Sequence, residues 1–266
     1  GVRIMAYTNI DDPSAYFQVK LWTGTGAAGN TITLDGNSDM QPDFMWHKEP
    51  TDTNGWHQMD SSRGPTYVLA SQSDGAEYDV LNSYISSFNS NGFTAGYGDS
   101  SINSAGVSQC SWMWHCNGGT TSSNTDGTVT STVQVNQDAG FSIVTWTTGV
   151  GSGNHSVGHG LGVKPAMFIT KSRGGTSSWW TWHQGLAGDT SYVNLQATTA
   201  EQTFSDIWGD GITSSVFGYN YPATVNANQT YIAYCFAEKQ GYSKFGKYVG
   251  NGSPNGPFIY TGFKPA

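Results

Sequence analysis

The chain has 266 residues with a formal net charge of −8 and a pI near 5.0, and charged residues make up only 11% of it. Abundant aromatic residues (14%) exclude a disordered chain, and the scattered Lys and Arg leave no basic stripe for binding nucleic acid phosphates. No apolar run approaches the roughly 18 residues of a membrane span. Scarce Glu and Lys, with 35 glycines and many Thr, Ser and Trp, favour strands and turns, so the composition predicts an all-β protein.

Residues 1–15 are predicted to be a connector. A short strand at Val2–Tyr7 precedes a turn at Asn9–Pro13. The chain starts on this connector and stops inside a repeated motif, so we expect it to be part of a longer protein.

Residues 16–118 form the first predicted unit. Short strands are expected at Thr66–Ala70, Gly92–Gly96 and Val107–Cys116, and Tyr78–Phe88 favours strand and loop over helix. Both faces of the strand at Gln109–Cys116 carry bulky side chains, so this strand is expected in the centre of a sheet with both sides covered.

A linker is predicted over residues 119–139, with a turn at Asn124–Gly127 before an alternating strand at Thr128–Val135. A second unit follows over residues 140–240. Residues 241–266 are interpreted as the start of a third, truncated repeat that would pair with unit two or with a neighbouring chain.

The two units repeat the same order of motifs, most of them about 122 to 126 positions apart. Agreement over most of a unit indicates a tandem duplication. With turn signals between short strands and no long crossover helix, it predicts two tandem antiparallel β-sandwich domains of jelly-roll or lectin-like type. The matched pairs are Phe17 with Phe141, Trp22 with Trp146, Trp56-His57-Gln58 with Trp182-His183-Gln184, Ala76-Glu77 with Ala200-Glu201, Ser86-Ser87-Phe88 with Ser214–Phe217, and Gln109–Trp114 with Tyr231–Phe236.

Three cysteines, Cys110, Cys116 and Cys235, are predicted to be buried reduced thiols. Six residues of strand separate the first two by about 20 Å, far beyond the roughly 7 Å reach of a disulfide. No zinc-binding spacing occurs, and the glycines around His155 and His159 remove the helical meaning of their four-residue spacing. No metal and no cofactor is expected.

Four histidines follow a tryptophan, at positions 47, 57, 115 and 183. Because strand neighbours face opposite sides, we expect the tryptophan of each pair in the core and the histidine on a wet face. An acidic run, Asp35, Asp39, Asp43 and Asp60, is explained by turns and surface positions. No motif for nucleophilic catalysis, phosphate binding or dinucleotide binding appears, so the protein is predicted not to be an enzyme.

Aromatic residues expected in loops are the candidates for a carbohydrate site. Trp56 and the pair Trp179-Trp180 fall at corresponding places, with His57 and His183 nearby. Flat aromatic faces beside polar groups suit sugar rings. The competing interpretation is that these tryptophans cover a sandwich edge or contact a neighbouring subunit.

Several motifs carry a family resemblance: Asn124–Thr128, Ala139–Val144, Val157–Gly162, Tyr231–Phe236, Gly241–Gly246, Gly256–Phe258 and Tyr260–Ala266. Through them the chain resembles a module of tail-fibre-like and other virion structural proteins of bacteriophages, especially marine and cyanobacterial ones. The resemblance covers nearly the whole chain from about Phe17. In unit one QCSWMWHC stands where unit two has YIAYCF, which leaves open whether unit one binds anything.

The resemblance implies an oligomeric virion component, assembled in the cytoplasm of a bacterial host, with no catalytic residues to assign. We therefore expect a non-enzymatic tail fibre or surface decoration. Its expected partners are other virion proteins, further copies of itself and host-surface glycans, with no nucleic acid and no membrane insertion. The alternative is a carbohydrate-active enzyme or free lectin, which requires an open cleft lined by Trp56 or Trp180 with two convergent carboxylates.

Overall fold

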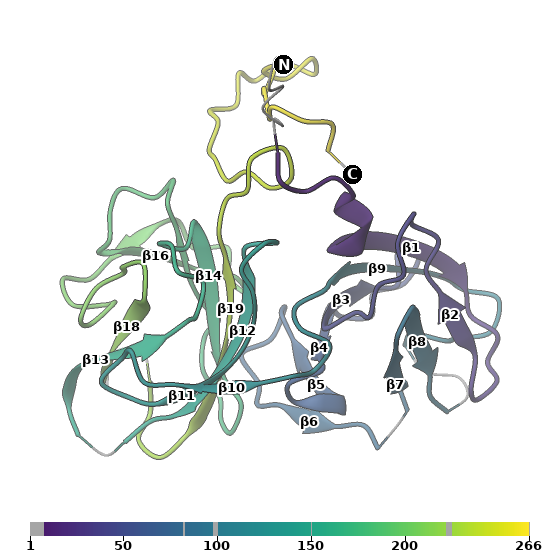
Figure 1. The fold of residues 1–266 in the computed structure, drawn as a ribbon, viewed down its shortest axis with the longest axis horizontal. Coiled ribbons are helices and arrows are strands. Elements are labelled where there is room, and N and C mark those ends of the chain that lie inside the picture. The colour runs from purple at the N-terminus through teal and green to yellow at the C-terminus, as the bar shows by residue number, and fades with distance from the viewer. Residues whose placement is uncertain (1–7, 82, 98–100, 150, 222–224, 266) are drawn as a thin grey trace, which may run out of the picture.

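The computed structural model describes residues 8–265 except 82, 98–100, 150 and 222–224. Within them the chain forms β-strands and one 3-10 helix, η1 (Pro13–Ala15), and its sheets pair strands antiparallel (Figure 1). The all-β antiparallel fold predicted from composition is confirmed. The strand predicted at Val2–Tyr7 lies outside the described residues.

The first half of the chain contains a six-stranded sheet facing a three-stranded one. The large sheet has the order β1-β9-β3-β4-β5-β6 and the small sheet has the order β2-β8-β7. The strands are β1 (Phe17–Thr23), β2 (Thr31–Thr33), β3 (Phe44–Lys48), β4 (His57–Asp60), β5 (Gly64–Ala70), β6 (Tyr78–Asp79), β7 (Ile85–Asn89), β8 (Gly92–Ala95) and β9 (Ser108–Trp114).

The second half contains an eight-stranded sheet, order β10-β11-β12-β19-β14-β15-β16-β17, and a two-stranded one, β13-β18. The strands are β10 (Ser122–Asn124), β11 (Ser131–Asn136), β12 (Phe141–Thr147), β13 (Gly153–Gly158), β14 (Met167–Ser172), β15 (Trp180–His183), β16 (Ser191–Asn194), β17 (Gln202–Thr203), β18 (Val216–Tyr221) and β19 (Thr230–Phe236).

The two halves share one strand order. In the large sheet of the second half, the order β12-β19-β14-β15-β16-β17 corresponds strand by strand to the order β1-β9-β3-β4-β5-β6 of the first half. An aromatic pair repeats as well: Trp22 meets Phe93 edge to face with ring centroids 5.3 Å apart, and Trp146 meets Phe217 at 5.5 Å. This geometry matches Phe217 with Phe93, which corrects the sequence alignment that matched it with Phe88.

Strand register also corrects a second alignment. Met45 opposes Met59, and the equivalent Phe168 opposes Trp182. Trp182 therefore corresponds to Met59 rather than to Trp56, and the true counterpart of Trp56 is Trp179. The short motif Trp-His-Gln occurs in both halves, but its copy in the second half lies three residues further along the equivalent strand. Matching the identical motifs therefore pairs residues that are not structurally equivalent.

The segment predicted as a linker belongs to the second half. Its strands β10 and β11 extend the eight-stranded sheet, with Ser131 opposite Trp146 and Asn136 opposite Phe141. The predicted alternating strand begins three residues later than expected, and its Val133 is buried in the second core. The first half has no described counterpart of this pair of strands, so β1 forms an edge where β12 is covered.

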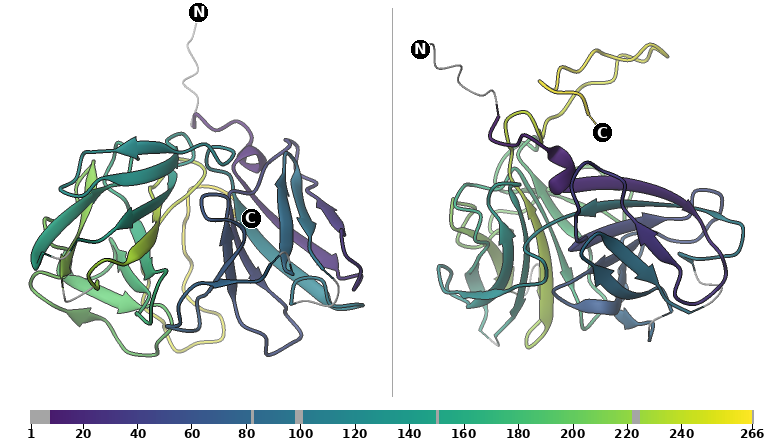
Figure 2. Two further views of the ribbon diagram at one scale, coloured as in Figure 1. Left: turned by 90° about the horizontal axis from the view of Figure 1, so that it is seen from below. Right: turned by 45° about the vertical axis from the view of Figure 1, so that its right-hand side comes forward.

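The two large sheets pack against each other, with the small sheets on the outside (Figures 1 and 2). Each half has its own core between its large and small sheets. A third core joins the halves and includes Phe44, Leu69, Ile143, Ile169, Tyr234 and Phe236. Both faces of each large sheet are therefore covered over part of their area, as predicted for the strand now seen as β9, which lies between β1 and β3.

The C-terminal segment, residues 241–265, lies above the junction of the two halves (Figure 1). Its described residues form no strand, and their pairing with unit two is an isolated antiparallel bridge between Ser243 and Lys239 rather than the predicted strand pairing. Apolar side chains in this segment are open to solvent: Tyr248, Val249, Phe258, Ile259 and Tyr260.

The remaining local predictions concern Tyr78–Phe88 and the cysteines. The segment Tyr78–Phe88 contains β6 and most of β7 with a loop between them, so it is strand and loop rather than helix, as predicted. All three cysteines are free and buried, which confirms the prediction of buried thiols.

Candidate functional site

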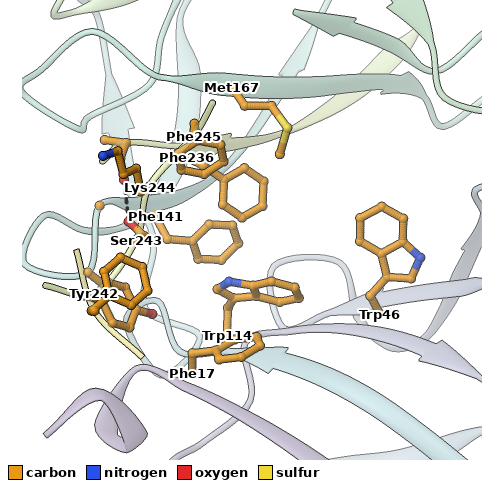
Figure 3. Close-up of a pocket in the computed structure, with 14 residues that line it drawn as sticks. Phe17, Trp46, Trp114, Phe141, Met167, Phe236, Tyr242, Ser243, Lys244 and Phe245 are labelled. Carbon is orange, nitrogen blue, oxygen red and sulfur yellow. Dashed lines mark hydrogen bonds between the residues drawn. The ribbon is translucent and has the colours of Figure 1, made fainter. Parts of the chain in front are cut away.

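An aromatic cavity of about 300 Å³ lies where the two large sheets meet. Phe17, Trp46 and Trp114 enter it from the first sheet, while Phe141 and Phe236 enter it from the second (Figure 3). Residues Tyr242–Phe245 and Phe263 of the C-terminal segment close one side. The rings are in mutual contact, with centroids of Phe141 and Phe236 4.9 Å apart.

The lining of this cavity offers stacking surfaces and little polar chemistry. The Ser243 hydroxyl is already used, because its Oγ donates to the Ala237 carbonyl at 3.0 Å. Lys244 is the charged residue of the lining. Within the described residues, no acidic, histidine or cysteine side chain lines the cavity. It can hold an apolar ring, and the lining side chains that carry a hydroxyl or an ammonium group are Tyr242, Ser243 and Lys244.

A row of three indoles leads from the cavity to the surface. Trp46 lines the cavity and meets Trp56 edge to face at 6.5 Å, and Trp56 lies 5.7 Å from Trp112. Trp56, the middle ring of the row, is 38% exposed and therefore accessible. Of the five predicted carbohydrate-binding residues, Trp56 presents a free aromatic surface.

Trp179 occupies the matching position in the second half but is only 1% exposed. Its Nε1–H donates to the carbonyls of Ala70 and Ser73 in the first half, at 3.1 and 2.9 Å. Trp179 does stand in a loop, directly before β15, but the expectation that its face is free is wrong. The competing interpretation, in which the ring covers a sandwich, fits its position, because the first half of the same chain buries it.

The other three predicted residues are separated from Trp56 and from one another. His57 points into the core of the first half, where its ring lies 5.0 Å from Tyr84, and burial lowers its pKa to about 4. Trp180 packs on Tyr192 at 4.9 Å beside the second core. His183 is half-buried, 6.0 Å from Phe245 of the C-terminal segment. The five residues do not form one site.

Two of the tryptophan–histidine pairs have the opposite orientation to the one expected. His47 is buried, and burial lowers its pKa to about 3, while its neighbour Trp46 faces the other large sheet. His57 is likewise inside and Trp56 outside. On the outer face of the sheet, Trp46 packs against the core between the halves, while Trp56 stays 38% exposed.

Asp43 is fully buried, which corrects its expected role at the surface. Its Oδ2 accepts the backbone N–H groups of Cys116, Asn117 and Gly118 at 2.7, 3.0 and 2.9 Å, and the His115 ring lies 3.1 Å away. Burial alone would raise the pKa of Asp43, but these hydrogen bonds hold it at about 2. The carboxylate thereby fixes the chain where it leaves β9 for the second half.

Asp60 is also buried, within a polar network between the halves. Arg63 donates to Asp60, to Glu77 at 2.8 Å and to the Tyr234 hydroxyl at 3.2 Å, and that hydroxyl donates to Asp60 at 2.7 Å. Burial acts to lower the pKa of Arg63, but the adjacent carboxylates raise it, so the guanidinium stays charged. Arg173 of the second half holds the other oxygen of Glu77 at 2.8 Å.

Sequence reasoning missed this network. One local signal was available: Asp60 and Arg63 lie three residues apart at a turn, in a chain where charge is rare. The pairing of Glu77 with Arg173 spans 96 positions and has no counterpart pattern in the repeat. Its discovery required the relative placement of the two halves.

No group of three or more His, Cys, Asp or Glu side chains in the described part of the chain could hold a metal ion. Nor does the described part include a helix long and apolar enough to cross a membrane.

These features define an all-β protein whose two large sheets are joined by an aromatic core and a buried ionic network. The family model described as "Domain of unknown function (DUF7483)" matches residues 12–266, and the chain belongs to this family. No curated protein and no solved structure matches the chain.

Proposed function

We propose that the chain is a non-enzymatic structural module of a virion, either a tail fibre or a surface decoration, whose β-sheets make assembly contacts. The observation that carries this proposal is apolar surface left open on β1, a strand that is paired on one side only within the described residues. Leu21 and Val19 of β1 are 69% and 38% exposed. Exposed apolar groups of this kind are typical of surfaces that proteins bury on association.

The state of the ionisable groups supports a structural role. Asp43, Asp60 and Glu77 are bound by guanidinium, hydroxyl or backbone donors inside the molecule. A general acid or base needs access to a substrate, whereas the side chains of Asp43 and Asp60 are fully buried and that of Glu77 is only 9% exposed. Against the effect of burial, hydrogen bonds and guanidinium groups also hold the pKa of Asp43 and of Glu77 below the usual range of a carboxyl group. The virion assignment itself rests on the resemblance of the sequence motifs to those of phage structural proteins.

Purified particles test this proposal. Mass spectrometry of virions purified by density gradient, with antibody labelling seen by electron microscopy, should find the protein in stoichiometric copies on the particle. Its absence from particles, in a lysate that contains it, would refute the assignment.

Glycan binding is the second candidate, and the row of Trp46, Trp56 and Trp112 favours it, because Trp56 is 38% exposed and sugar rings stack on indoles. A glycan array should then show binding that Trp56→Ala abolishes. Tyr78→Ala is a matched control, because Tyr78 is also 38% exposed but stands on the opposite edge strand, β6. Equal binding by both variants, or none by the parent chain, would reject this candidate.

A further inference from the structure

The large sheets of the two halves have four edge strands, and three of them are very short. β6 and β17 have two residues and β10 has three, whereas β1 has seven. Proteins limit unwanted strand pairing by shortening their edges, by placing proline or lysine on them, or by covering them. The edges formed by β6, β10 and β17 are short, as this rule expects, whereas β1 is a long edge strand.

The backbone of β1 is open on one side. Tyr16 and Gly24 are bonded to His115 and Val107 of the neighbouring segment, so the even-numbered residues between them face β9. The N–H and C=O groups of Val19 and Leu21 therefore point away from the sheet. No hydrogen bond to these four groups is found from the described residues.

The repeat shows that a strand fits at this place. In the second half β12 is the counterpart of β1, and β11 lies antiparallel beside it. Val19 corresponds to Ile143, which is fully buried, whereas Val19 itself is 38% exposed. The same position is covered in one half and uncovered in the other.

The charge on β1 does not block this edge. Lysine in the middle of an edge strand normally opposes pairing. Here the Lys20 ammonium lies 2.8 Å from Asp35, which compensates its charge. The strand contains no proline, and its sequence FQVKLWT is rich in residues that favour strands.

We propose that β1 pairs antiparallel with β1 of a second copy of this chain, across a twofold axis, and so joins two six-stranded sheets into one. This inference rests on the proposed assembly role and names the partner. An edge strand that pairs with itself makes the same contact on both copies, which closes a dimer.

One register suits the side chains best. With Val19 opposite its own copy, Phe17 faces Leu21 on the outer side of the sheet, and Gln18 faces Lys20 on the inner side. A register centred on Lys20 would set two ammonium groups directly opposite, which is unfavourable. The Val19-centred register avoids this repulsion and buries the exposed Leu21.

Proline substitution tests the pairing. The N–H of Leu21 is not bonded to β9, so Leu21→Pro removes an edge donor while leaving the ladder within the chain intact. Leu21→Thr, the matched control, shortens the side chain but keeps the donor. Sedimentation velocity over a range of concentrations should show a dimer for the parent chain and for Leu21→Thr, and a folded monomer for Leu21→Pro.

A charge exchange tests the register and covers the possibility that Leu21→Pro fails to fold. Val19→Glu and Val19→Lys should each be monomeric, because like charges oppose across the axis, and an equimolar mixture should form a heterodimer. A parent chain that stays monomeric at all concentrations would overturn the inference, as would a dimer unaffected by these changes. A monomer that is still found in virions would overturn it while leaving the proposed function intact.

Discussion

Arg63→Met should destabilise the protein by about 3–5 kcal/mol, the usual cost of removing one partner from a buried ion pair. The Arg63 side chain is fully buried and donates to Asp60, Glu77, the Gln58 carbonyl and the Tyr234 hydroxyl. Its removal leaves the buried Asp60 carboxylate with the Tyr234 hydroxyl but without a counter-ion. Glu77 keeps Arg173, which is why the loss stays within this range.

Equilibrium denaturation in urea, followed by tryptophan fluorescence, measures this change. Lys164→Met provides the comparison, because its ion pair with Asp189 is about half exposed on both sides and should contribute less than about 1 kcal/mol. Adding Asp60→Asn to Arg63→Met should recover part of the loss, since no unpaired carboxylate then remains at that position. An Arg63→Met variant as stable as Lys164→Met would refute the buried network as a structural element.

Three further changes follow from the same contacts. Trp179→Phe should cost about 1–2 kcal/mol in urea denaturation, because two carbonyls of the first half lose their donor; a neutral result would mean that the indole N–H does not tie the halves. The free energy of unfolding should fall as the pH drops below about 6.5, the ordinary pKa of histidine. In the folded protein His47 and His57 have pKa values of about 3 and about 4, so they bind fewer protons there than in the unfolded chain. At pH 5 each histidine should account for a loss of about 2 kcal/mol relative to neutral pH, so denaturation at the two pH values checks the sum. His57→Gln should flatten the pH dependence by its own share, and an unchanged profile would contradict the burial of that ring.

Much of the strand arrangement could be predicted from the sequence, because turn residues and alternation are local signals. The match of Gln109–Trp114 with Tyr231–Phe236 agrees with the observed strand register, since the two segments oppose the equivalent strands β1 and β12. The match of Trp56 with Trp182 was wrong because the same short motif, Trp-His-Gln, stands at different positions of the equivalent strands. Identical residues therefore suggested an equivalence that the strand register does not have.

The site could be predicted only in part, because its chemistry depends on what covers each sheet. Trp56 and Trp179 are equivalent by register, yet one is 38% and the other 1% exposed. Nothing local distinguishes them; the difference arises because Trp179 reaches the carbonyls of Ala70 and Ser73. The burial of Asp43 was likewise invisible, since its three backbone donors lie more than 70 positions along the chain.

The open edge of β1 as an assembly contact is the central claim, and residue-resolved amide hydrogen exchange tests it most directly. At low concentration the amides of Val19 and Leu21 should exchange fast, while those of Gln18, Lys20 and Trp22 are protected by β9. At high concentration the first two should gain protection and the other three should change little. Fast exchange at Val19 and Leu21 under all concentrations would contradict the account.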